Sequence, residues 1–139
     1  MNSNKKTADM VNMKVILSTL WVFATLNYLY CDVVTLMDPV YLKRLMTGVA
    51  GGIQITQGFL LGAAILVEIP IAMVLLSRIL KYRASRWANI IAGTIMTAVQ
   101  ILTLFVGTPT IYYVFFSAIE ITCTALIVWY AWRWPNIEV

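Results

Sequence analysis

Residues 52–77 read GIQITQGFLLGAAILVEIPIAMVLLS, and Glu68 is the only ionisable side chain among them. About 20 mostly apolar residues are enough for a helix to cross the hydrocarbon core of a bilayer. Backbone polar groups in lipid must find their partners within the protein, which favours a helix over an open extended segment. The stretch therefore predicts a membrane-spanning helix with a carboxyl group inside it.

The composition of the whole chain is that of an integral membrane protein. Of its 139 residues, 61% are hydrophobic and 12% are charged, whereas an average soluble domain has about 25% charged residues. The chain has no His, which excludes imidazole bases and the common haem, zinc and di-iron ligand sets. Cys31 and Cys123 lie in different apolar stretches, so we predict no disulfide framework, no metal site and no cofactor.

Three more apolar runs complete a predicted bundle of four spans. The first run is about twice the length of a signal-peptide core, which favours a span over a cleaved leader. Asp38-Pro39 is a helix stop after the first span, and Gly107-Thr108-Pro109 is a turn before the fourth. The predicted fold class is all-α: a polytopic membrane protein with an antiparallel four-helix bundle. The predicted parts are an N-terminal segment, 1–14, a membrane domain, 15–134, with spans at 15–37, 52–77, 88–107 and 110–132, and a tail, 135–139.

The Lys and Arg residues predict the orientation of these spans. Two of the ten, Lys43 and Arg44, lie between the first span and the second. The other eight lie on the opposite side of the membrane: Lys5, Lys6, Lys14, Arg78, Lys81, Arg83, Arg86 and Arg133. Cytoplasmic loops are enriched in Lys and Arg, so we expect both termini in the cytoplasm. The formal net charge of +4 then reflects orientation, and no basic groove interleaved with aromatic residues indicates nucleic-acid binding.

Three carboxyl groups lie within the predicted spans: Asp32, Glu68 and Glu120. At a rise of about 1.5 Å per residue, they are expected roughly 8, 22 and 15 Å from the outer boundary. An ionisable group in hydrocarbon costs at least about 2.5 kcal/mol on insertion scales and is a functional candidate by default. No Lys or Arg is predicted at these depths. The acids are therefore either neutral and hydrogen-bonded, or they carry a proton in transit or hold a cationic ligand.

Polar residues at helical spacing accompany the acids on every predicted span. The four strips are Asn27, Tyr28, Asp32 and Thr35; Gln57 and Glu68; Asn89, Gly93, Thr97 and Gln100; and Tyr113, Ser117, Glu120 and Thr124. Facing strips could simply hydrogen-bond the bundle together. Alternatively, they line a polar pocket whose residues are Glu68, Glu120, Asp32, Asn27 and Gln100. Pro70 frees the carbonyl of Leu66 from its helical hydrogen bond, so a kink is expected beside Glu68.

The segment between the first two spans has its own signals. Residues 38–52 mix apolar side chains with Lys43 and Arg44, which favours a short helix in the outer interface. Small residues let helices approach closely, within the bundle or between protomers. Five glycines suit that role here: Gly48, Gly51, Gly52, Gly58 and Gly62.

Four segments carry a resemblance to a known family. They are LSTLWVFATLNYLYCD at 17–32, ILVEIPIAMVLLSR at 65–78, RWAN at 86–89 and FFSAIE at 115–120. They resemble a group of small four-helix bacterial membrane proteins without assigned activity. More distantly, four spans with an acid in the second resemble the DoxX-like bundles, which include respiratory accessory subunits and folding helpers. The resemblance implies a compact antiparallel bundle in the bacterial inner membrane, and the lack of His weighs against a redox role.

Three functional hypotheses follow. In the first, the chain is a binding or transport module in which Glu68 and Glu120, with Asp32, bind protons or a cationic or polar small molecule. Asn27, Gln100 and Tyr113 would then supply neutral hydrogen bonds, and a homodimer would help four spans to build a two-sided path. In the second, the chain is a non-catalytic accessory subunit or membrane chaperone whose acids pair with a cation on a partner helix. In the third, it is a membrane-embedded enzyme that uses a carboxyl group on a lipid-like substrate.

Overall fold

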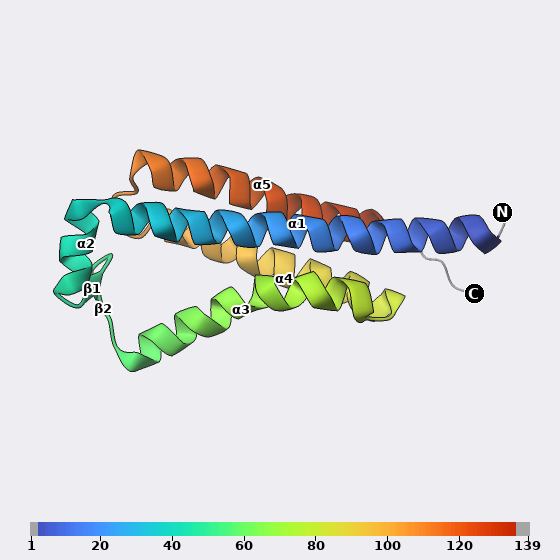
Figure 1. Ribbon diagram of the computed structural model, residues 1–139, viewed down its shortest axis with the longest axis horizontal. Helices are drawn as coiled ribbons and strands as arrows, with labels where there is room; N and C mark the ends of the chain where they lie inside the picture. The colour runs from blue at the N-terminus through green and yellow to red at the C-terminus, as the bar shows by residue number, and fades with distance from the viewer. Residues whose placement is uncertain (1–2, 136–139) are drawn as a thin grey trace.

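The computed structural model describes residues 3–135 (Figure 1), and the predicted tail lies outside this range except for Pro135. The chain is all-α, as predicted, apart from one small hairpin. The helices are α1 (Ser3–Met37), α2 (Pro39–Met46), α3 (Gln57–Ile79), α4 (Tyr82–Thr103) and α5 (Ile111–Arg133). Strands β1 (Val49–Ala50) and β2 (Ile53–Gln54) pair antiparallel and form the hairpin between α2 and α3.

The four long helices form a ring. Helix α1 packs beside α3 and α5, and α4 packs beside the same two helices on the far side of the ring. The first and last described residues lie at one end of the molecule, whereas α2 and the hairpin cover the other end (Figure 1). We call these the terminal end and the cap end.

Helices α1, α3 and α5 are long and apolar enough to cross a membrane. They contain most of the predicted spans 15–37, 52–77 and 110–132. The predicted third span, 88–107, corresponds to α4, which begins at Tyr82 and ends at Thr103. The predicted span began too late because it was defined by hydropathy, which excludes polar and charged residues such as Arg83, Ser85 and Arg86. These residues nevertheless form the first turns of α4.

Local sequence explains where the cap-end elements begin. The Asp38 carboxylate accepts hydrogen bonds from the backbone N–H groups of Val40 and Tyr41, and Pro39 occupies the first turn, where its missing N–H costs nothing. Thr56 caps α3 in the same way by accepting from Phe59 N. A short helix therefore forms between the first two long helices, as the sequence favoured.

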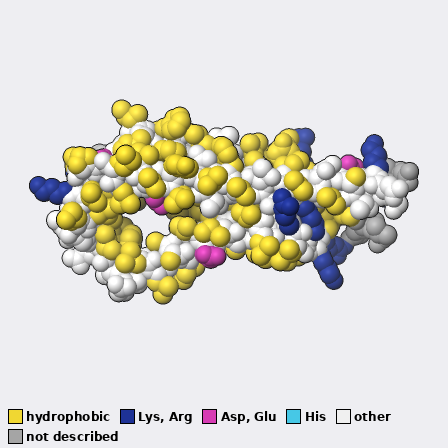
Figure 2. Space-filling view, viewed as in Figure 1, with side chains coloured by type: hydrophobic (Ala, Val, Ile, Leu, Met, Phe, Trp, Pro, Cys, Tyr) yellow, Lys and Arg dark blue, Asp and Glu magenta, His cyan; other side chains and the backbone are white. Residues whose placement is uncertain are grey.

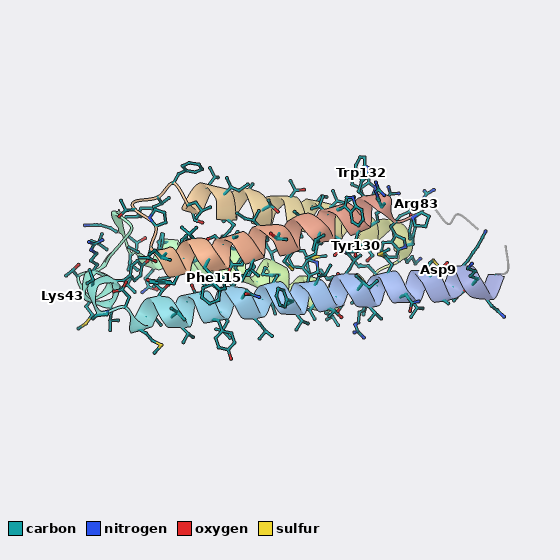
Figure 3. All side chains as sticks on the ribbon, turned by 90° about the horizontal axis from the view of Figure 1, so that it is seen from above. Asp9, Lys43, Arg83, Phe115, Tyr130 and Trp132 are labelled. Atoms are coloured by element: carbon teal, nitrogen blue, oxygen red, sulfur yellow. The ribbon has the colours of Figure 1, made fainter. Side chains whose placement is uncertain are left out.

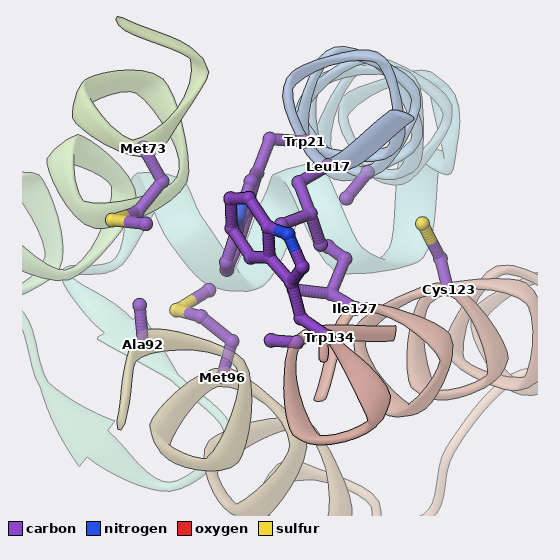
Figure 4. Packing of buried hydrophobic residues seen from close by; sticks show 10 residues of the cluster. Leu17, Trp21, Met73, Ala92, Met96, Cys123, Ile127 and Trp134 are labelled. Carbon is purple, nitrogen blue, oxygen red and sulfur yellow. The ribbon is translucent and has the colours of Figure 1, made fainter. Parts of the chain in front are cut away.

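The buried hydrophobic core lies in the terminal half of the ring. Figure 4 shows its side chains packed between the long helices. Trp21, Met73, Met96 and Ile127 bring α1, α3, α4 and α5 together there, and Trp134 closes it from the chain's end. Each of these side chains is at most a few per cent exposed. The helices are consequently held together most firmly near the terminal end.

Helix α3 leaves the ring in its first half. Every residue from 57 to 65 is exposed, whereas Pro70, Met73 and Ser77 in the second half are buried. Figure 1 shows α3 changing direction between these halves, where Pro70 lacks the N–H that a straight helix would use. In Figure 2 the parting is an opening through the molecule, bordered by hydrophobic side chains and with acidic groups at its edge.

The glycines are used differently from the close packing that their spacing favoured. Gly48, Gly51 and Gly52 have positive φ and shape the turn around the hairpin. Among residues 3–135, no atom lies within 4 Å of the place where a Cβ of Gly62 would be, so Gly62 makes no close contact with another described helix. The close approach occurs at Gly93 instead, where a Cβ would lie 2.7 Å from Val128 Cγ2.

Candidate functional site

Glu120 is the central residue of the site. It lies on the inner face of α5 between Ser117 and Thr124, and the exposed fraction of its side chain is 1%. Its carboxyl oxygen Oε1 is buried and has no hydrogen-bond partner among residues 3–135. A buried polar atom without a partner costs about 1–3 kcal/mol, so the position calls for an occupant or a function.

Helix α4 supplies a polar wall beside Glu120. Gln100 Nε2 donates to Ser117 Oγ at 2.7 Å, and the hydroxyls of Thr97 and Thr124 lie 2.7 Å apart. Tyr113 lies against Gln100 one turn nearer the cap end. The predicted polar strips of these two helices therefore face each other and hydrogen-bond, and Glu120 is the member of the strip that stays unpaired.

Helix α1 supplies a second wall. Tyr28 and Asp32 are both close enough to interact electrostatically with Glu120. The hydroxyl of Tyr28 is buried and, like Glu120 Oε1, has no hydrogen-bond partner. Two neighbouring polar groups are thus left unsatisfied at the same level of the bundle.

Asp32 lies on the side of α1 from which α3 has parted. Ser18 marks that side, because its hydroxyl donates to Val74 O of α3 at 2.8 Å. Asp32 follows Ser18 by fourteen residues, which is about four turns at about 3.6 residues per turn, so both lie on the same face. Asp32 is exposed, unlike Glu120. It therefore lies on the side of α1 from which the first half of α3 has parted, and nearer the cap end than Glu120.

Residues of α2, at the cap end, lie near this site. Tyr41 is half-buried, and burial, then the neighbouring Tyr112, raises the pKa of its phenol. Asp32 is a further electrostatic neighbour of Tyr41. The Tyr112 hydroxyl donates to Asp38 Oδ2 at 3.2 Å, which ties α5 to the start of α2. The site thus lies between the cap and the tightly packed terminal half.

Two of the residues predicted for the site lie elsewhere. Glu68 precedes Ser77 by nine residues, about two and a half turns, which places it on the opposite face of α3. Ser77 faces the core and Glu68 is exposed, in agreement with that geometry. Asn27 donates to Phe23 O of its own helix and is only half-buried. The structure brings Glu120, Asp32, Gln100 and Tyr113 to one region, adds Tyr28, and leaves Glu68 and Asn27 out.

Basic side chains lie far from the site. Within residues 3–135, none of Asp32, Glu68 and Glu120 forms an ion pair with Lys or Arg. Several of the cations bind carbonyl groups at helix C-termini instead: Lys14 Nζ donates to Leu80 O at 2.6 Å, and Arg86 Nε donates to Ala131 O at 3.1 Å. Figure 3 shows Lys43 at the cap end and Arg83 at the terminal end. The acid of the site therefore has no internal counter-ion from the described chain.

A buried polar cluster closes the terminal side of the core. Asn89 Oδ1 accepts from Trp21 Nε1 at 2.7 Å and from Ser77 Oγ at 3.0 Å, while Asn89 Nδ2 donates to Ser85 O at 2.8 Å. Sequence reasoning placed Asn89 in a polar strip but missed its partners. A single Ser or Trp in an apolar helix carries no signal of which helix it will meet.

Other features of the described chain do not join the site. Residues 3–135 contain no group of three or more Asp, Glu, Cys or His side chains that could hold a metal ion. A groove of about 390 Å³ runs between α1 and α5, lined by Leu20, Phe23, Phe115, Ala118, Ile119, Thr122, Cys123 and Leu126. It is almost wholly apolar, as a lipid-facing seam between two helices would be.

Comparison with known proteins places the chain in a family. Residues 7–139 match the profile described as a family of unknown function (DUF6326), and the chain belongs to that family. No curated protein and no solved structure matches it. The match agrees with the resemblance to a family without assigned activity, while the more distant DoxX-like resemblance stays a prediction.

Proposed function

We propose that this chain is a four-span membrane protein that binds a proton or a positively charged small molecule at Glu120, inside the bilayer. The observation that carries the proposal is the state of that carboxyl group within residues 3–135: Glu120 is 1% exposed, its Oε1 has no hydrogen-bond partner, and no Lys or Arg forms an ion pair with it. An unpaired carboxylate in a low-dielectric interior is very costly, so a bound proton or a bound cation stabilises the site.

The distribution of side chains on α4 supports a fourth span. Helix α4 has 22 residues, a length of about 33 Å, which matches a hydrocarbon core of about 30 Å. Its polar residues Ser85, Asn89 and Gln100 are buried against other helices. Its exposed face carries large apolar side chains instead: Trp87, Ile91, Ile95, Ile101 and Leu102. A helix with polar residues inside the bundle and apolar residues outside is suited to contact with lipid. The buried polar residues lower the mean hydropathy of α4, although they are not exposed to lipid.

The ends of the bundle support an orientation. Eight of the ten Lys and Arg lie at or near the terminal end, and Lys43 and Arg44 lie at the cap end. Figure 3 labels one residue of each group, Arg83 and Lys43, at these opposite ends. By the positive-inside rule, both termini then lie on the cytoplasmic side of a bacterial inner membrane, and the cap end lies on the opposite side. In this orientation the opening beside α3 lies in the outer half of the bilayer, and the Asn89 cluster lies in the inner half.

The arrangement favours access from the outer half. Asp32 is exposed and negatively charged when ionised, so it attracts cations toward the parting between α1 and α3. Glu120 lies deeper, beside Tyr28 and next to the Gln100–Ser117 pair. A cation that reaches Glu120 replaces the acid's proton, so binding of one is linked to release of the other.

Calorimetric titration of the purified protein with tetraphenylphosphonium, an apolar cation, tests this proposal. We expect binding by the unsubstituted chain with release of protons into weakly buffered solution. Glu120→Gln keeps the size and polarity of the side chain but removes its charge, so it should weaken binding about tenfold or more and abolish proton release. The matched control is Glu68→Gln, the same substitution on the outward face of α3, which should bind the probe as the unsubstituted chain does.

Infrared difference spectroscopy during a pH titration tests the proton by itself. The carbonyl band of a neutral carboxylic acid should decrease as Glu120 ionises, and this change should be missing from Glu120→Gln. The proposal is wrong if Glu120→Gln matches the unsubstituted chain in both the calorimetric and the infrared measurement. It is also wrong if Glu68→Gln loses probe binding to the same extent.

A further inference from the structure

Glu68 is in an unfavourable position for a single copy of this chain in a bilayer. It is the twelfth of the 23 residues of α3, so it lies near the middle of that helix. Its side chain is exposed on the face opposite Ser77 and forms no hydrogen bond or ion pair with residues 3–135. In lipid, an exposed carboxyl group at this depth has neither water nor protein to bind.

The face around Glu68 has the chemistry of a helix–helix contact. Leu61, Ile65 and Leu75 lie on the same side of α3 and are 63, 60 and 60% exposed. Ala64 and Ala72 are four residues before and after Glu68, so they flank it along one face. Small residues at this spacing let two membrane helices approach closely, and a polar side chain between them stabilises the contact.

We infer that a second copy of this chain covers this face, with Glu68 of each copy bound to Glu68 of the other. A neutral carboxylic acid has one O–H donor and one carbonyl acceptor, so two such groups can form a reciprocal pair. A two-fold axis along the bilayer normal places equivalent residues of two copies at the same depth. The Glu68 groups then meet each other, as do the Ala64 groups and the Ala72 groups.

The shape of α3 and the charges of the chain favour a second copy over a different protein. The first half of α3 has left the ring and is exposed on every side, so it is free to pack against another helix. A partner protein would have to place a polar or charged side chain of its own at the middle of the membrane to pair with Glu68, and such side chains are costly there. A second copy brings the complementary group at no such cost, because the carboxylic acid is complementary to itself.

Subunit counting in lipid vesicles tests the interface. Fluorescently labelled protein is reconstituted at decreasing protein-to-lipid ratios, and photobleaching steps report the dimer fraction. Glu68→Leu should weaken dimerisation about tenfold, because it removes both reciprocal hydrogen bonds. Glu68→Gln should keep it, since an amide also donates and accepts. Ala64→Leu should weaken it by blocking close approach, whereas Ala125→Leu, the same substitution on the exposed face of α5, should not.

Disulfide cross-linking tests the register on an otherwise native chain. Oxidation should convert Ala64→Cys and Ala72→Cys into covalent dimers, because each position lies opposite its own copy across the axis. Ala125→Cys should stay monomeric under oxidation, and native Cys31 and Cys123 should not react because both are buried. Efficient cross-linking at 125 but not at 64 or 72 would overturn the inference.

Two further outcomes would also overturn it. One is a dimer fraction of Glu68→Leu equal to that of the unsubstituted chain. The other is purification of the chain with a different membrane protein that is lost on Glu68→Leu. The interface and the Glu120 site can fail separately: Glu68→Leu should keep tetraphenylphosphonium binding, and Glu120→Gln should keep the dimer.

Discussion

At the scale of single residues, two glutamates with the same chemistry have opposite surroundings. Glu120 faces the interior of the ring and is buried, while Glu68 faces outward and is exposed. The first is therefore the position at which we propose a bound proton or small ligand, and the second is the position at which we propose contact with another helix. Which of the two roles a membrane carboxyl group takes depends on a rotation of its helix by half a turn.

Gly93 shows a residue-scale constraint that spacing alone did not reveal. A Cβ at this position would lie 2.7 Å from Val128 Cγ2 and 3.3 Å from the carbonyl oxygen of Thr124. Helices α4 and α5 therefore approach closely only because position 93 has no side chain. Gly62, in contrast, has open space where its Cβ would be.

We predict that Gly93→Leu lowers the free energy of unfolding by about 1–3 kcal/mol, because the added side chain forces α4 and α5 apart. The measurement is unfolding in mixed micelles with increasing SDS, followed by circular dichroism. Gly62→Leu is the matched control and should leave the free energy of unfolding unchanged or higher. Equal losses at the two positions would contradict the close approach at Gly93.

At the scale of elements, Asn89 joins three helices in the terminal half of the ring. Its Oδ1 accepts from Trp21 on α1 and from Ser77 on α3, and its own backbone belongs to α4. Pro70 lies between this joined half of α3 and the half that has left the ring. One half of α3 is thus held by hydrogen bonds and core packing, and the other is free to serve a different contact.

Asn89→Ala should lower the free energy of unfolding by about 1–3 kcal/mol, since two buried donors lose their acceptor. The same denaturation in SDS micelles measures it. Asn27→Ala provides the comparison, because within residues 3–135 the Asn27 side chain hydrogen-bonds only to Phe23 O of its own helix. That variant should change the free energy by less than about 0.5 kcal/mol. A loss at Asn27 as large as the loss at Asn89 would show that the cluster does not join the helices.

At the scale of the whole molecule, the number of membrane crossings determines on which side of the bilayer each end of the chain lies. Three helices meet the length and apolarity of a span, and the proposed fourth, α4, hides its polar side chains inside the ring. With α4 as a span, both ends of the chain lie on one side and the cap on the other. With three spans, the two ends of the chain would lie on opposite sides of the membrane.

Reporter fusions test this arrangement. Alkaline phosphatase, which is active only outside the cytoplasm, should be active when fused after Gly52 or Gly107 and inactive when fused after Lys81 or Pro135. The expected cause is the excess of Lys and Arg at the terminal end. An active fusion after Pro135 would leave three spans as the simplest account and would contradict the proposed topology.

Much of the fold could be predicted because hydropathy and charge are properties of consecutive residues and can be read directly from the sequence. Lipid requires long apolar helices with internal hydrogen bonds, so the approximate positions of α1, α3 and α5 follow from their composition. Asp38-Pro39 and the glycine-containing turns ended helices because their effects are local. The hydrogen bonds between the strips of α4 and α5 also follow from helical spacing once the two helices are neighbours.

The facing of α3 could not be predicted in the same way. Its 23 residues are apolar on nearly every side, so no periodicity tells which face meets the core. Packing against Trp21, Met96 and Asn89 selected the face with Met73 and Ser77, and that choice turned Glu68 outward. Burial of one face is a property of neighbouring helices in three dimensions, which is why only the folded arrangement separates the acid at 120 from the acid at 68.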